Sequence, residues 1–444
     1  MRDLPLAVIL LVLAAVGFIR PFLGLLGWTW VTYFSPTQFT WGWSRSIPGG
    51  EAVAIPTLVG LLFTPERRLP PITRETLLLI TLWLWFGVTT LNVLHSPLLA
   101  HHYVETLGQM LQVSKTLLMT FVALMLLIDK NKLRWWYLVT VACFIVLCVK
   151  DVTWVALTGG EFQIYGPGRS MIADNNDFAL AVNICLPMIY YLAKTEASRP
   201  IRLALWASLP FAALAVVLTY SRGGLLGLLA VMLAIALQSK HKIRGLSLIL
   251  GLALLAFLVA PGKWIERMET IRTAAQSDPS ARSRFFAWKF STLVALDHPV
   301  LGGGFETFTG EMYDRYGMGG HEIVHGPHSI YFQMLAEHGF PGLAIFLAIL
   351  ISCMLTCQRL KRRCRRADPD SWLIPYCSMV IASLCAYATS GAFLGRAYFV
   401  MFYQLVATTI LLTAFARAEM AARRREEAAV ELELPVLHPT TLSV

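Results

Sequence analysis

Long apolar runs separated by short basic clusters constrain this chain more than any other feature. Hydrophobic residues make up 56% of the 444 positions and charged residues only 14%, whereas about a quarter of the residues of a soluble domain are charged. About 20 apolar residues cross a bilayer as a helix, and a helix satisfies its own backbone polar groups inside lipid. The sequence therefore predicts an all-α, polytopic integral membrane protein.

The basic clusters predict the topology, because positively charged loops stay in the cytoplasm. If all of them are cytoplasmic, the chain crosses the membrane about twelve times and keeps both ends inside. Residues 4–34 then cross once, as a helix broken at Pro21, and serve as a retained anchor and not as a removed signal. The other spans are expected at 50–64, 74–94, 107–128, 135–157, 171–193, 201–219, 223–238, 243–260, 340–358, 373–392 and 397–416.

Four segments follow from this topology. Residues 1–260 are expected to form the first transmembrane helices, and 261–339 one large periplasmic loop. Residues 340–418 supply the last three spans, and 419–444 a cytoplasmic tail whose composition is typical of disorder. The formal charge of +10 is explained by the basic loops, so no nucleic-acid partner is expected. The eight cysteines avoid the large loop, so neither a disulfide framework nor a thiolate metal site is indicated.

Unusual polar residues gather at the outer ends of the predicted spans. Arg169 precedes the span that opens with Asn175 and Asn176, and Arg222 lies in a very short connection. Ionisable groups at membrane depth are costly and point to function, but an arginine at a helix end can also reach the lipid headgroups. Both interpretations stay open for Arg169 and Arg222.

The large loop adds arginines and histidines. Arg282 and Arg284 could bind phosphate through the planar fork of the guanidinium group, or they could belong to a solvated helix face. His328 and His338 lie near the return to the membrane, and a histidine can take a proton from a hydroxyl group. These residues suggest an enzyme that acts on an anionic, membrane-borne substrate.

The segment HEIVH at 321–325 matches a zinc-protease pattern in which two histidines hold the metal. The glycines before it and Gly326-Pro327 after it disfavour the helix that such a site requires. We therefore expect no metal.

Three further motifs carry a resemblance to a known family. They are SARSRFFAWKF at 280–290, DHPVLGGGFETF at 297–308, and His328-Ser329 followed after nine residues by the Gly-x-x-Gly of 339–342. In this order, late in a polytopic chain, they resemble the O-antigen ligase and polymerase superfamily. The DNNDFAL stretch at 174–180 is also similar to O-glycosylation ligases associated with exosortase systems.

The resemblance implies a glycosyltransferase of the bacterial inner membrane, with its active site facing the periplasm. It would transfer a polysaccharide from undecaprenyl diphosphate to the lipid A core in one inverting displacement, without metal or cofactor. Arg222, Arg169 and either Arg282 or Arg284 would then bind the diphosphate. His328 or His338 would position or deprotonate the acceptor, Glu337 could orient His338, and Asn175 and Asn176 could support the site.

Other functions stay open. A polymerase of the same superfamily would use a lipid-linked glycan as acceptor, and a protein O-glycosylation ligase would use a Ser or Thr hydroxyl. A transporter or flippase is the alternative from another class, with Lys115, Lys150 and Asp151 as possible coupling sites. A transporter usually places its site near the midplane, whereas the charged residues here gather at one face.

Overall fold

The computed structural model describes residues 3–159, 162–239, 242, 279–319 and 324–433. Within these ranges the regular elements are all helices and no strand is present, which confirms the all-α prediction. They are α1 (Asp3–Ile19), α2 (Pro21–Phe34), η1 (Pro36–Phe39), η2 (Trp43–Ser46), α3 (Gly49–Phe63), α4 (Arg74–His95), η3 (Ala100–His102), α5 (Tyr103–Leu126), α6 (Lys130–Leu157), α7 (Asn175–Thr195), α8 (Arg199–Leu218), α9 (Arg222–Gln238), α13 (Pro279–Asp297), α14 (Gly310–Arg315), α15 (Ile330–Ala367), α16 (Leu373–Gly391) and α17 (Val400–Glu433).

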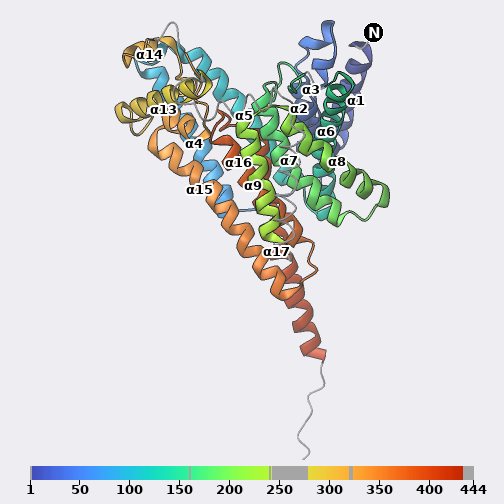
Figure 1. Cartoon of the computed structure of the whole chain (residues 1–444). Coiled ribbons are helices and arrows are strands. Elements are labelled where there is room, and N and C mark those ends of the chain that lie inside the picture. Colours follow the sequence, from blue (N-terminus) through green and yellow to red (C-terminus); the bar gives the residue numbers. More distant parts are fainter. Residues whose placement is uncertain (1–2, 160–161, 240–241, 243–278, 320–323, 434–444) are drawn as a thin grey trace, which may run out of the picture.

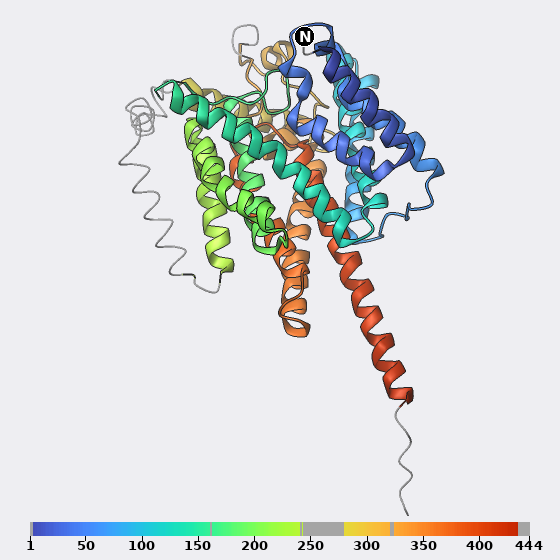
Figure 2. The ribbon, with the colours of Figure 1, turned by 90° about the vertical axis from the view of Figure 1, so that its right-hand side faces the viewer.

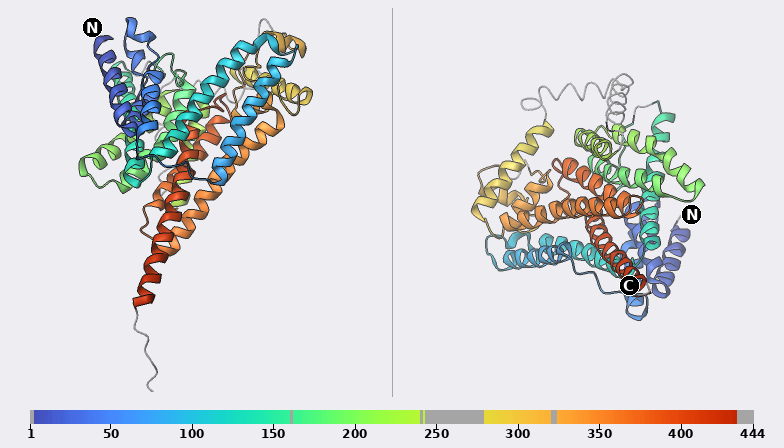
Figure 3. Two further views of the ribbon diagram at one scale, coloured as in Figure 1. Left: turned by 180° about the vertical axis from the view of Figure 1, so that it is seen from behind. Right: turned by 90° about the horizontal axis from the view of Figure 1, so that it is seen from below.

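The long helices run up and down between two ends of the bundle (Figure 1). We call one end the loop face, where α13 and α14 lie together with the connections that follow α4, α6, α8 and α16. The opposite end is the tail face, where α15 ends and α17 extends beyond the other helices (Figure 2). Seen from below, α15, α16 and α17 lie between α4 and α5 on one side and α7 to α9 on the other (Figure 3).

Eight helices in the described ranges are long and apolar enough to cross a membrane, and α1, α3 and α9 are shorter apolar helices. Their positions fit the spans predicted from residue 50 onward, except that the span at 243–260 lies outside the described residues. This confirms a polytopic membrane protein. The total of about twelve crossings stays a prediction.

The N-terminal segment folds differently from the expected single crossing. Arg20 leaves the helical conformation, and α1 and α2 turn back on each other as a hairpin. A carboxylate oxygen of Asp3, at the start of α1, accepts a hydrogen bond at 3.0 Å from the backbone N–H of Ser44, which follows α2. Pro21 opens α2 because proline suits the first position of a helix. The predicted single crossing of 4–34 is therefore wrong.

This hairpin also changes the predicted topology. The start of α1 lies on the loop face, whereas the end of α17 lies beyond the tail face (Figure 1). The two ends of the described chain therefore lie on opposite faces. The prediction that both ends share one side is wrong. The residues of the predicted tail up to Glu433 continue α17 as a helix, and 434–444 lie outside the described residues.

The helix α7 forms the centre of the bundle and is the most buried of the membrane-crossing helices. The side-chain amide of Asn183 donates to the backbone carbonyl of Gly224 at 2.7 Å, which holds α7 against α9. A Cβ at Gly227 would lie 1.8 Å from Oγ of Ser390, so the lack of a side chain allows α9 to approach α16. This packing brings the loop-face ends of three helices together.

The described part of the large loop packs over the loop face. The segment 302–306 is held between two helices, because the N–H groups of Gly303 and Gly304 donate to carbonyls in α15 and the Thr106 hydroxyl of α5 donates to the carbonyl of Phe305. The predicted boundary at 339/340 falls inside α15, where Gly339 has a φ of 66° and kinks the helix. The division into four segments otherwise stays a prediction.

Candidate active site

A groove of about 580 Å³ opens on the loop face where three regions of the chain meet. It is formed by the start of α7, the start of α13 with the segment before α15, and the loop between α16 and α17. Three of the residues proposed from sequence, Arg284, His328 and Asn176, lie in its wall. The lining residues are Asp174, Asn176, Asp177, Ser283, Arg284, His325, Gly326, Pro327, His328, Leu394, Gly395 and Arg396.

The N-terminus of α7 supplies one wall. The side chain of Asp174 caps the helix by accepting from the N–H of Asn176 at 2.8 Å and also from the amide group of Asn176 at 2.9 Å. This contact fixes the side chain of Asn176 at the groove. Asn175 is buried instead and donates to the carbonyl of Thr219 at 2.8 Å, so it holds the turn before α9 in place.

Arg396, in the loop between α16 and α17, is a groove residue that the sequence reasoning missed. Its guanidinium Nε donates to Oδ1 of Asp177 at 2.7 Å, and a second nitrogen bonds to Oδ2. Burial lowers the pKa of Arg396, but the carboxylate of Asp177 more than offsets this effect and the pKa is raised. The sequence did contain a signal for Arg396. It lies in a short connection between two apolar spans, and the same feature had pointed to Arg222.

The segment that carries His328 approaches the same loop closely. A Cβ at Gly395 would lie 2.7 Å from Cγ of Pro327, so glycine is needed for this contact. Burial lowers the pKa of the His328 imidazole, and electrostatic interaction with Arg284 and with His325 lowers it further, against the opposing effect of Asp174. A histidine in this environment is neutral near neutral pH and can accept a proton.

The second candidate, His338, lies behind the groove in the protein interior. Its side chain is 0% exposed. The Nδ1 atom lies 2.8 Å from the Thr89 hydroxyl and Nε2 lies 2.7 Å from the Tyr398 hydroxyl, while the ring packs against Phe86 and Phe305. Both nitrogens are therefore engaged within the protein, which suits a structural histidine.

Glu337 is buried beside His338 but contacts it indirectly. The Tyr398 hydroxyl donates to Oε2 of Glu337 and is also the partner of His338 Nε2. The other carboxylate oxygen accepts from the N–H of Glu306 at 3.2 Å. Glu337 and Tyr398 thus tie α15 both to the segment 302–306 and to the loop that carries Arg396.

The other predicted arginines lie on the loop face but outside the groove. Arg169 is exposed, with a φ of 56°, and Arg282 is exposed at the start of α13. Arg222 is half-buried at the first position of α9. Of the four arginines proposed from sequence, only Arg284 lines the groove.

The possible zinc motif is only partly described. His321 and Glu322 lie outside the described residues, and His325 lines the groove. In the described part of the chain no three His, Cys, Asp or Glu side chains are arranged to hold a metal ion. The expectation of a metal-free site stays a prediction.

The groove thus combines two guanidinium groups and a neutral imidazole with the carboxylates of Asp174 and Asp177. Guanidinium groups bind phosphate oxygens, and a neutral histidine can deprotonate a hydroxyl group. This arrangement can hold an anionic leaving group beside a nucleophile that loses a proton.

Comparison with known families identifies two segments. Residues 203–347 match the model of a family described as O-antigen ligase. The matched segment contains most of α8, all of α9 and α13, and Arg284 and His328. Residues 1–197 match a family of unknown function. The loop that carries Arg396 lies outside both matches.

Curated relatives occur in Rickettsia species. A protein of Rickettsia prowazekii (strain Madrid E) named "Putative polysaccharide ligase" is 31% identical over 169 residues, which cover 37% of this chain and 40% of the relative. A protein of the same description from Rickettsia typhi (strain ATCC VR-144 / Wilmington) is 30% identical over 163 residues, covering 35% of this chain and 39% of the relative. The matches thus span about two fifths of these relatives.

Proposed function

Because this chain belongs to the O-antigen ligase superfamily, we propose that it is a glycosyltransferase that transfers a glycan from undecaprenyl diphosphate to a hydroxyl of the lipid A core. The observation that carries this proposal is the groove that brings Arg284, Arg396 and His328 together. In the proposal the loop face is periplasmic and the membrane is the bacterial inner membrane. The basic connections on the tail face support that orientation.

Arg284 and Arg396 bind the diphosphate of the donor. Negative charge grows on the bridging oxygen as the bond to the anomeric carbon breaks, and fixed guanidinium groups stabilise that charge in the transition state. Arg396 keeps donors available beyond those given to Asp177, because a guanidinium group has five N–H bonds. Arg169, Arg222 and Arg282 contact more distant parts of the carrier or glycan.

His328 acts on the acceptor. The neutral imidazole takes the proton of the acceptor hydroxyl while its oxygen forms the new bond to the anomeric carbon. The bond between that carbon and the diphosphate oxygen breaks in the same displacement, so the configuration inverts. His338 and Glu337 support the groove from behind, and Asn175 and Asn176 fix the start of α7.

The acceptor defines the main alternatives. A polymerase would use a second lipid-linked glycan as acceptor, and a protein O-glycosylation ligase would use a Ser or Thr hydroxyl. In both cases the arginines would bind the diphosphate and the histidine would take the acceptor's proton. The transporter alternative receives less support. Lys115 forms an ion pair with Glu51 at 2.8 Å, and Lys150 pairs with the neighbouring Asp151, so these charges have partners away from the groove.

The decisive test is transfer in vitro. The purified chain in detergent is mixed with undecaprenyl-diphosphate glycan and lipid A core in the presence of EDTA. Core-linked glycan is the expected product, and its formation without divalent metal would also discard the zinc motif. Product only on the lipid carrier would indicate a polymerase, and no product would redirect the search to protein acceptors. Movement of intact donor across a vesicle membrane would overturn the proposal.

A further inference from the structure

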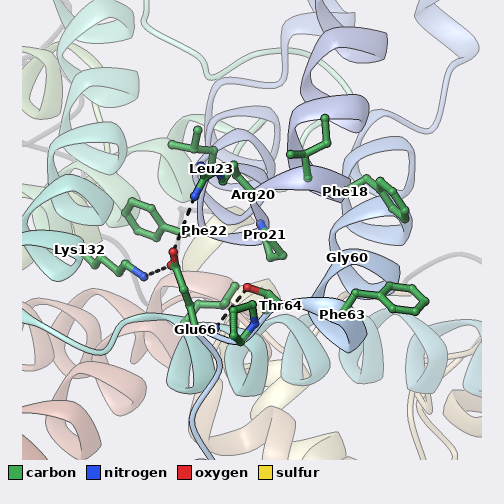
Figure 4. A pocket seen from close by; sticks show the side chains of 13 residues that line it. Phe18, Arg20, Pro21, Phe22, Leu23, Gly60, Phe63, Thr64, Glu66 and Lys132 are labelled. Atoms are coloured by element: carbon green, nitrogen blue, oxygen red, sulfur yellow. Dashed lines mark hydrogen bonds and ion pairs between the residues drawn. The ribbon is translucent and has the colours of Figure 1, made fainter.

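A second cavity, of about 500 Å³, lies on the tail face, away from the groove on the loop face. It is enclosed by the turn between α1 and α2, the end of α3 with residues 64–66, and the junction of α5 and α6 (Figure 4). Apolar rings and three charged side chains share its wall. None of these residues belongs to the site described above.

The helices of this corner are short for a membrane crossing. α1, α2 and α3 contain 17, 14 and 15 residues, which correspond to about 26, 21 and 23 Å of helix. The hydrocarbon layer is about 30 Å thick, and α6, with 28 residues, is long enough to cross it. The turn at Arg20 therefore lies in a recess beside a longer helix. Either lipid headgroups enter this recess, or the bilayer becomes thinner around it.

The charged residues in the recess carry an excess of positive charge. A carboxylate oxygen of Glu66 lies 2.7 Å from Nζ of Lys132 and the other lies 3.9 Å from a guanidinium nitrogen of Arg20 (Figure 4). The hydrogen bond from Lys132 lowers the pKa of Glu66, so one negative charge faces two positive ones. Arg67 and Arg68 follow Glu66 and are exposed, while Asp129, at the start of α6, is the other nearby acid.

The cations retain hydrogen-bonding capacity toward a ligand. Lys132 has three N–H donors and Arg20 has five, and the side chain of Arg20 is 71% exposed. Around them the walls are apolar, because Phe18, Phe63 and Leu23 expose large parts of their side chains. The rings of Phe18 and Phe63 lie 6.5 Å apart, on the side of the cavity away from Lys132 (Figure 4).

We propose that this recess binds an anionic membrane phospholipid on the tail-face leaflet, with the headgroup phosphate at Arg20 and Lys132 and an acyl chain along Phe18, Leu23 and Phe63. Basic pockets between transmembrane helices bind anionic headgroups. A zwitterionic lipid brings its own positive charge to the same cations and gains less. The lipid fills the space that the short hairpin leaves and fixes α1 to α3 against α5 and α6.

Native mass spectrometry of the purified full chain tests this proposal, with phosphatidylglycerol and phosphatidylcholine of equal chain length as probes. We expect the chain to retain phosphatidylglycerol in preference. The double variant Arg20→Ala/Lys132→Ala should lower the affinity for phosphatidylglycerol by roughly 25-fold, or about fivefold for each cation lost. Glu66→Gln should raise it, because a negative charge beside the phosphate is removed. Arg45→Ala is the matched control, since Arg45 is an exposed arginine on the loop face.

Elution volume and thermal midpoint in detergent establish that each variant is folded. If the double variant does not fold, Arg20→Ala alone and Glu66→Gln still test the proposal, because both leave Lys132 in place. Equal binding of the two lipids by the unmodified chain, or unchanged phosphatidylglycerol affinity in Arg20→Ala, would overturn it. Preferential retention of polyprenyl phosphate over phosphatidylglycerol would also overturn it as a phospholipid site.

Discussion

Arg396 and Asp177, 219 positions apart in the chain, form a two-point ion pair across the loop face. The pair joins the loop before α17 to the first turn of α7. Asp177 is almost completely buried, whereas about a third of the Arg396 side chain is exposed, at 6% and 36%. One side of the guanidinium group is thus held by the protein while the other faces the groove.

Removing Arg396 should destabilise the protein as well as impair transfer. Arg396→Ala leaves the Asp177 carboxylate buried without its partner, which costs about 1.5–3 kcal/mol for a charged hydrogen bond of this kind. The thermal midpoint in detergent should fall. The double variant Arg396→Ala/Asp177→Ala should lose less than the sum of the two single variants, because no unpaired charge remains. Additive losses would show that the pair is not coupled.

Arg284 and Arg282 provide a matched test of diphosphate binding. Arg284→Ala should lower kcat/KM by about 10- to 150-fold, the effect of losing a charged contact of roughly 1.5–3 kcal/mol in the transition state. Arg282→Ala, two residues away and exposed, should change it much less. Steady-state transfer kinetics with the lipid-linked donor measure both variants. Similar losses in the two would contradict the assignment of Arg284 to the groove.

The alanine variants of His328 and His338 should lose activity for different reasons. His328→Ala should leave the fold intact and lower the transfer rate by about 100- to 10,000-fold, as expected when a positioned base is lost. His338→Ala removes a fully buried, hydrogen-bonded ring, so its main effect should be a lower thermal midpoint. Rate per folded molecule, measured beside the melting curve, separates the two effects. Full activity of folded His328→Ala would exclude it as the base.

The pH dependence follows from the lowered pKa of His328. A general base works in its neutral form, so kcat/KM should rise with pH as the imidazole loses its proton and then reach a plateau. Because the pKa lies below the usual 6.5, the plateau should begin below the pH expected for an ordinary histidine. Arg284→Ala removes a nearby positive charge and should move the rise to higher pH, whereas Arg284→Lys keeps the charge and should not. An identical rise in all three proteins would contradict this coupling.

Tyr398 should be important for stability through one hydroxyl group. Tyr398→Phe leaves both Glu337 and Nε2 of His338 without that partner, at a cost of about 1–3 kcal/mol. The matched control is Tyr403→Phe, since the buried hydroxyl of Tyr403 has no hydrogen-bond partner among the described residues. Thermal midpoints of the two variants should differ clearly, and equal midpoints would show that the Tyr398 contacts contribute little.

The sequence by itself predicted the apolar helices that the described residues contain from residue 50 onward, the membrane class and the resemblance to the O-antigen ligase superfamily. These properties depend on local features, namely the length of apolar runs, the position of basic clusters and motifs read along the chain. The same local features placed Arg169, Arg222, Arg282 and Arg284 on one face. They could not show which arginine faces a histidine.

Only the tertiary structure decided the groove and the N-terminal hairpin. Arg396 meets Asp177, and Pro327 meets Gly395, because α7, α15, α16 and α17 pack side by side although they are distant in sequence. The hairpin depends on packing against α3, whereas the sequence predicted a single crossing by a helix broken at Pro21. Contacts of this kind are set by how helices pack, and no local pattern in the chain encodes them.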